Sequence, residues 1–122
     1  MDKAQAINRF WNQFLPAYDV YTVPSDAEFP YITYSVSTDS IGNPILMNAS
    51  LWFYSDSWEA ISVLTETIAR YITQMNPPAL KIDDGRLYIA KGTPFAQRMD
   101  DPSDKNIRRM VLQIQVEYLT AY

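Results

Sequence analysis

The 122-residue chain contains no cysteine and no histidine. Without cysteine it can form no disulfide, iron–sulfur cluster or thiolate zinc site. Without histidine it lacks the usual general base near neutral pH and the commonest metal ligand. The serines and threonines therefore have no evident partner that would activate them as nucleophiles. We expect no catalytic residues, no metal site and no cofactor, and we interpret the chain as a non-enzyme.

Long apolar runs and an excess of positive charge are also missing. No stretch approaches the roughly 20 apolar residues of a membrane helix, and the opening "MDKAQAINRF" lacks the apolar core of a signal peptide. We therefore expect a soluble intracellular protein with no membrane partner. The net charge is −4, whereas a sequence-independent nucleic-acid binder usually carries a basic excess. DNA is not expected as a tightly held ligand, although it can pass nearby without binding.

Apolar side chains recur at helical spacing in two segments. The first places Ile7, Phe10, Trp11, Phe14 and Leu15 on one stripe. It has Asp2 as a candidate N-cap and ends near Pro16. The second covers residues 55–75, with Asp56 as N-cap, Glu59 completing a capping box, and Asn-Pro-Pro at 76–78 as the stop. Its buried stripe is predicted to contain Trp58, Ile61, Leu64, Ile68, Tyr71, Ile72 and Met75.

Apolar and polar residues alternate in the remaining segments, as in half-buried strands. These segments are residues 28–37, 45–55, 80–92 and 106–120, the third being a hairpin that turns at Asp84-Gly85. The long strands are predicted to face the core with Ile45, Met47, Ala49, Leu51 and Phe53, and with Met110, Leu112, Ile114, Val116 and Tyr118. We predict a single α+β domain over residues 1–122, with a mostly antiparallel sheet and two helices packed on one face.

A long loop is predicted at residues 93–106, between the last two strands. Structureless connections of this length are usually functional or disordered. Two pairs of adjacent carboxylates, Asp83-Asp84 and Asp100-Asp101, lie in or near connections. We interpret the first pair as turn residues rather than catalytic ones. A weak calcium site formed by Asp100, Asp101 and Asp104 is conceivable, but solvated loop charge is the favoured interpretation.

Two aromatic side chains fall on the face opposite the predicted core. Trp52 and Tyr54 alternate with core residues, and amphipathic aromatics in such positions are enriched at protein interfaces. The pair Arg108-Arg109 permits two interpretations, a solvated strand start or an ion pair with an acidic neighbour. Adjacent strand residues point to opposite faces, so at most one of the two arginines can meet a given partner.

The order of these segments and parts of their text resemble a known family. The residues concerned are "FPYITYSV", then "KGTPF" at residues 91–95 before the loop, and the alternating final strand "NIRRMVLQIQVEYL". Together they resemble the tail terminator (tail completion) proteins of long-tailed bacteriophages and prophages, which are also described as minor capsid or neck proteins. The likeness covers nearly the whole chain and lies in the pattern more than in a sharp motif.

The resemblance implies a virion assembly role. It implies a small α+β subunit that forms a homo-oligomeric, hexameric ring on the finished tail tube. The ring ends tube polymerisation and presents a docking surface for the head–tail connector or head-closure protein. It also implies assembly in the host bacterial cytoplasm, a place in the tail or neck of the virion, and DNA that passes through the ring without specific binding. The residues expected to contact other subunits or the tube are Trp52, Tyr54, Pro94, Phe95, Gln97, Arg98, Met99, Asp100, Asp101 and Arg109.

The loop then has a candidate role. We hypothesise that residues 93–106 form an arm that orders on an adjacent subunit or on the tube, with Phe95 as apolar anchor and Pro94 limiting the entropy lost on docking. Two other functions remain open. One is a head-closure or neck adaptor protein, and the other is a small peptide- or ligand-binding module that uses the Trp52 and Tyr54 face.

Overall fold

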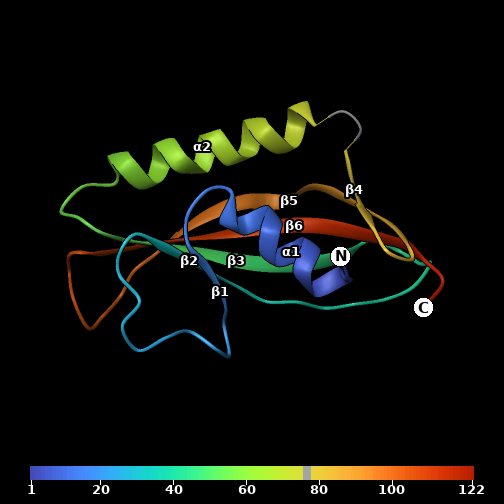
Figure 1. The fold of residues 1–122 in the computed structure, drawn as a ribbon. Helices are drawn as coiled ribbons and strands as arrows, with labels where there is room; N and C mark the ends of the chain where they lie inside the picture. Colours follow the sequence, from blue (N-terminus) through green and yellow to red (C-terminus); the bar gives the residue numbers. More distant parts are fainter. Residues whose placement is uncertain (76–77) are drawn as a thin grey trace.

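The structure, a computed structural model, describes residues 1–75 and 78–122 (Figure 1). In chain order its elements are α1 (Lys3–Asn12), β1 (Ala17–Asp19), β2 (Tyr31–Tyr34), β3 (Ile45–Tyr54), α2 (Glu59–Gln74), β4 (Ala79–Ile82), β5 (Gly85–Met99) and β6 (Ile107–Thr120). The six strands form one sheet in the order β1-β2-β3-β6-β5-β4. Only β1 and β2 pair in parallel among these described strands. The predicted α+β class with a mostly antiparallel sheet is confirmed.

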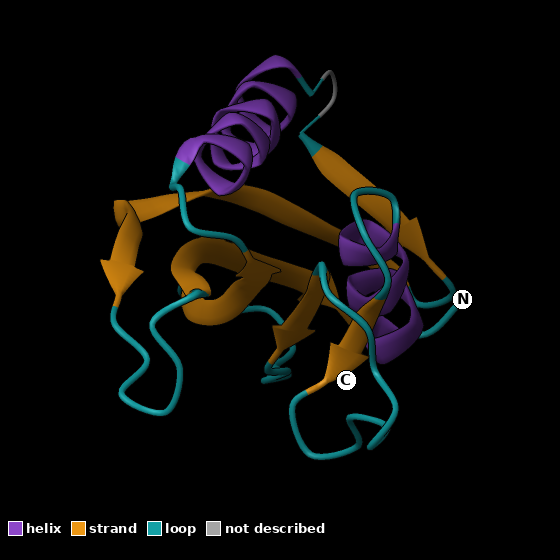
Figure 2. Cartoon of the chain, turned by 90° about the vertical axis from the view of Figure 1, so that its left-hand side faces the viewer, coloured by secondary structure: helices purple, strands orange, loops and turns teal. Residues whose placement is uncertain are grey.

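Both helices pack on the same face of the sheet. Helix α2 lies over β5, β6 and β3, whereas α1 contacts β1 and β2 near one edge and β4 at the other (Figure 1). A ten-residue helix can contact both edges of a six-stranded sheet only if the sheet curls around it, and Figure 2 shows this curvature. The face that carries the helices is therefore the inner face, and the opposite one is the outer face.

The core fills the inner face as the alternation predicts. All five predicted core residues of β6 are buried, as are Met47, Ala49 and Leu51 of β3. From α1, Ala6, Ile7, Phe10 and Trp11 are at most 2 % exposed. In α2 the buried residues are Ile61, Thr65, Ile68 and Ile72. Tyr71, predicted to be buried, is 40 % exposed and packs edge-on against Phe14, which follows α1.

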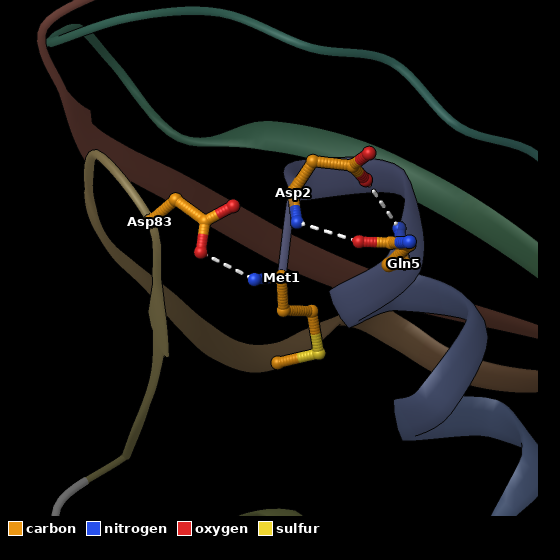
Figure 3. A network of polar contacts seen from close by, with 4 residues as sticks. All are labelled: Met1, Asp2, Gln5 and Asp83. Carbon is orange, nitrogen blue, oxygen red and sulfur yellow. Dashed lines mark hydrogen bonds and ion pairs between the residues drawn. The ribbon is translucent and has the colours of Figure 1, made fainter.

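The two helix starts differ from one another. Asp2 caps α1 as predicted, because its carboxylate accepts a hydrogen bond from the Gln5 N–H at 2.8 Å and the Gln5 side chain accepts one from the Asp2 N–H (Figure 3). The predicted Asp56 cap is wrong. Helix α2 begins at Glu59 after Trp58, which makes no side-chain capping bond, and the Ser57 hydroxyl accepts from the Glu59 N–H at 3.1 Å. The predicted Asn-Pro-Pro stop falls on residues 76–77, outside the described residues.

The turn between β4 and β5 lies one residue earlier than predicted. Its two central residues are Asp83 and Asp84, because Ile82 pairs with Gly85. Gly85 has φ +154°, and a Cβ there would lie 2.0 Å from the Leu119 carbonyl oxygen, so glycine is required for backbone approach. Asp83 also holds the start of the chain, since its carboxylate pairs with the Met1 amino group and its N–H donates to the Met1 carbonyl at 3.0 Å (Figure 3). The interpretation of the Asp83-Asp84 pair as turn residues is confirmed.

The predicted long loop at residues 93–106 is wrong over its first half. Residues 93–99 belong to β5, and Ala96 to Met99 pair with β6, which leaves residues 100–106 as the connection. The pairing shifts register between Lys91 and Ala96, an irregularity that accommodates Pro94, which has no N–H to donate to a ladder. The proline thus marks a bulge inside a long strand rather than its end.

Candidate interaction surface

The outer face of the sheet brings together residues that are far apart in the sequence. Tyr31 pairs with Trp52, Trp52 with Arg109, and Arg109 with Met99. These four residues form one row across β2, β3, β6 and β5. Three of them, Trp52, Arg109 and Met99, were predicted contact residues, and the register places them side by side.

Trp52 is held rigidly within this row. The Trp52 ring is nearly parallel to the Tyr31 ring, and their centroids are 6.3 Å apart. The guanidinium of Arg109, on β6, lies 4.8 Å from the centroid of the Trp52 ring. The indole N–H donates to the Thr33 hydroxyl at 2.9 Å. The Arg109 Nε–H donates to the Ser50 hydroxyl at 3.1 Å. Trp52 and Arg109 are therefore each held by contacts within the subunit.

More aromatic side chains extend the row at its β2 end. Phe29 packs on Tyr31 and Tyr54, with ring centroids 5.4 and 5.7 Å apart, and Tyr18 lies 6.2 Å from Tyr31. Their apolar surface is only partly covered, since Tyr54 is 55 % and Phe29 39 % exposed. Burial raises the pKa of the Tyr31 phenol above its ordinary value. We call this set the outer-face patch, and it consists of Tyr18, Phe29, Tyr31, Trp52, Tyr54, Met99 and Arg109.

The other predicted contact residues are more scattered. Gln97 lies on the outer face beside Val111, two residues before Met99 on the same strand. Pro94 lies at the bulge, and Phe95 is half-buried against the core of its own chain. Phe95 is therefore already engaged within the subunit, and the idea that it anchors an arm to a neighbour is not supported by its position.

Arg98 lies on the inner face, where its guanidinium is 4.8 Å from the centroid of the Trp58 ring. Arg108 approaches the same ring at 5.2 Å, and its Nη1 donates to the Lys105 carbonyl at 2.8 Å. Trp58 thus contacts two arginines near the start of α2. Arg108 and Arg109 point to opposite faces, as strand geometry predicts.

Asp100 and Asp101 follow β5 in the short connection. Asp101 accepts hydrogen bonds from the N–H and hydroxyl of Ser103 at 2.8 and 2.5 Å. These bonds hold the pKa of the Asp101 carboxyl below its ordinary value, and the positive charge of Arg109 adds a smaller effect. Asp104 accepts from the Asn106 N–H at 2.9 Å. Asp101 and Asp104 therefore shape the connection itself.

The sequence reasoning missed Tyr18, Phe29 and Tyr31. Strand alternation could have predicted Tyr31: because Ile32 and Tyr34 face the core, Tyr31 must share the outer face with Thr33. The position of Phe29 depends on the path of the chain before β2, which no local pattern specifies.

Comparisons with known proteins, and searches of the structure for metal sites and membrane helices, found no match and no such feature in the described residues. No protein-family model matches the chain, and no curated protein matches it. Within residues 1–75 and 78–122, no three acidic side chains are grouped so that they could hold a metal ion. None of the described helices is long and apolar enough to cross a membrane.

Proposed function

We propose that the chain is a structural assembly protein of a phage or phage-like tail. In this proposal its copies form a ring on the end of the tail tube, most simply a hexamer, which ends tube polymerisation and docks the head connector. The observation that carries the proposal is the row formed by Tyr31, Trp52, Arg109 and Met99 on a sheet face that neither helix covers. Tyrosine, tryptophan, arginine and methionine are the residues enriched at the centres of protein interfaces.

The same proposal places the chain in the neck of the virion after assembly in the bacterial cytoplasm. DNA would pass through the ring without specific binding, and the net charge of −4 supports this, because a negative wall repels phosphates. We propose no catalytic role, since the polypeptide contains neither imidazole nor thiol.

Co-expression with the tube protein of the same genome tests the proposal. We expect the chain to co-purify with the tube protein when no capsids are present, and the tubes to be shorter and more uniform than those formed without it. A chain that co-purifies only with connector or capsid proteins would instead be a head-closure or neck adaptor. If the chain leaves the length distribution of the tubes unchanged, the proposal that it ends tube polymerisation is refuted.

A second candidate function has one observation in its favour. A shallow cleft of about 250 Å³ lies beside the outer-face patch, and its lining includes Thr33, Asn48, Ser50, Trp52 and Arg109. Such a cleft would offer hydroxyl, amide and guanidinium groups beside the indole to a short peptide or small ligand. This candidate predicts a monomer at every concentration and quenching of tryptophan fluorescence on ligand binding, and a Trp52→Phe variant would identify the indole concerned.

A further inference from the structure

The edges of the sheet are closed to different degrees. At the β1 edge, the Asn12 side chain accepts from the Ala17 N–H at 3.0 Å and donates to the Ala17 carbonyl at 3.2 Å, so these backbone groups have partners. At the other edge, β4 pairs only with residues 85–88 of β5, and the Ile89 N–H donates to the Pro78 carbonyl. In the described part of the chain, residues 90–91 and 96–99 of β5 pair with β6 alone, and residues 92–95 form the bulge between them. We call residues 90–99 the open edge.

An open strand edge exposes backbone donors and acceptors to which another extended segment can add. Pro94 and the bulge interrupt this edge, so the positions open to such pairing are residues 90–91 and 96–99. The charged residues of this open edge are both basic, Lys91 and Arg98, and both are exposed. Neither has a carboxylate within ion-pairing distance among the described residues. A segment that adds here is therefore expected to carry negative charge.

The opposite end of the sheet carries such a segment. Residues 19–28, which begin at the last residue of β1, contain Asp19, Asp26 and Glu28 and no lysine or arginine. The same residues expose apolar surface, since Tyr21 is 91 % and Val20 47 % exposed. We call residues 19–28 the acidic segment. It combines negative charge with uncovered apolar side chains, and in the isolated subunit it is folded into turns, since the Thr22 N–H donates to the Asp19 carbonyl and the Ala27 N–H to the Pro24 carbonyl.

Within the described part of one molecule, no backbone hydrogen bond and no ion pair joins the acidic segment to the open edge. We propose that the acidic segment of one copy lies along the open edge of the next copy. This contact is heterologous, because each copy offers its acidic segment to one neighbour and its open edge to the other. Heterologous contacts close into a ring when the rotation between successive copies permits. The inference rests on the proposed ring and names the surfaces that join its subunits.

Charge reversal of each edge separately tests the contact. The first variant, Lys91→Glu with Arg98→Glu, has two acidic edges, and the second, Asp26→Lys with Glu28→Lys, has two basic edges. Each variant alone should be monomeric in sedimentation velocity at concentrations where the unmodified chain associates, with an apparent Kd raised about tenfold or more. An equimolar mixture should associate again, because each interface then joins opposite charges, and its assemblies should contain even numbers of subunits.

Cysteine crosslinking provides an independent measurement, since the chain has no thiol of its own. A mixture of Asp26→Cys and Arg98→Cys proteins should form disulfide-linked heterodimers under oxidation. The matched control replaces Arg98→Cys by Val63→Cys, at a 61 % exposed position on α2, and should not crosslink with Asp26→Cys. Thermal unfolding of every variant verifies that the fold is retained.

Three results would overturn the inference. The unmodified chain could stay monomeric at every concentration, the charge-reversed variants could associate as strongly as the unmodified chain, or the equimolar mixture of the two variants could remain monomeric. If the reversed variants still terminate tubes normally, the edge contact fails while the tail-capping function stands. If association follows the charge pattern but tubes are not capped, the contact stands and the capping function fails.

Discussion

Replacement of Tyr54 by alanine should weaken assembly far more than it weakens the fold. Tyr54 is 55 % exposed in the isolated subunit. An aromatic side chain buries about 150–250 Å² when fully covered, so about 110 Å² of Tyr54 remains for a partner to bury. At about 25 cal/mol per Å² this surface corresponds to about 2–3 kcal/mol. The corresponding rise in Kd is about 30- to 150-fold, an upper estimate because ordering costs on binding reduce it.

The effect on the free energy of unfolding should be much smaller, because the aromatic contact of Tyr54 in the subunit is with Phe29 at the surface. We expect a loss of about 1 kcal/mol or less. The matched control is Leu46→Ala, since Leu46 lies on the same face of the same strand, outside the outer-face patch, and is 57 % exposed.

The assay measures the fraction of tube ends that carry the protein over a series of concentrations, together with urea unfolding of each free subunit. Tyr54→Ala should shift the capping curve to higher concentration, whereas Leu46→Ala should leave it unchanged. Equal capping by both variants, with Tyr54→Ala fully folded, would show that the outer-face patch does not contact a partner.

Three further predictions concern the fold. Gly85→Ala should destabilise the subunit by more than about 1–3 kcal/mol in urea unfolding, because φ is +154° and a Cβ would lie 2.0 Å from a backbone oxygen of β6. The control Gly42→Ala should change the free energy of unfolding little, because its Cβ would be 3.4 Å from a flexible side chain. Equal effects of the two substitutions would contradict the strain argument. Asp2→Ala should cost about 1 kcal/mol through loss of the α1 cap, whereas Asp56→Ala should stay within about 0.5 kcal/mol, and the reverse order would show that the helix starts are misassigned. Burial raises the pKa of Tyr118 to about 12 from an ordinary value of 10.0, so its stabilising contribution is complete below pH 10 and is lost as the pH rises towards 12. Ultraviolet titration of the phenols should show a late-titrating group that is missing in Tyr118→Phe, and ionisation of Tyr118 together with the exposed phenols would contradict its burial.

The inner face of the sheet could be predicted from the sequence because strand alternation is a local property. Once Ile45 to Phe53 and Met110 to Tyr118 are recognised as strands, period 2 decides which residues face the core. The structure confirms this, although Ile45 and Phe53 at the ends of β3 are only partly buried. The Asp2 cap was equally local, since an N-cap and its partner lie three residues apart. Asp56 failed because the Ser57 hydroxyl accepts from the Glu59 N–H, the group that an N-cap at Asp56 was predicted to bind.

The extent of β5 and the make-up of the outer-face patch were beyond the local pattern. Pro94 interrupts a ladder in any sequence-based reading, and only the pairing of Ala96 to Met99 with β6 shows that the strand resumes. The alignment of Trp52 with Arg109 and Met99 depends on the register between strands separated by long stretches of chain. Register is set by the packing of the whole sheet, so the sequence indicated individual members of the patch but not that they share one row.

The most direct test of the central claim is negative-stain imaging, with mass determination, of the chain mixed with the tube protein of the same genome. The account predicts a closed ring of several copies at one end of each tube and no further growth from that end. Tubes with bare ends that continue to grow, beside a chain that remains monomeric, would contradict it.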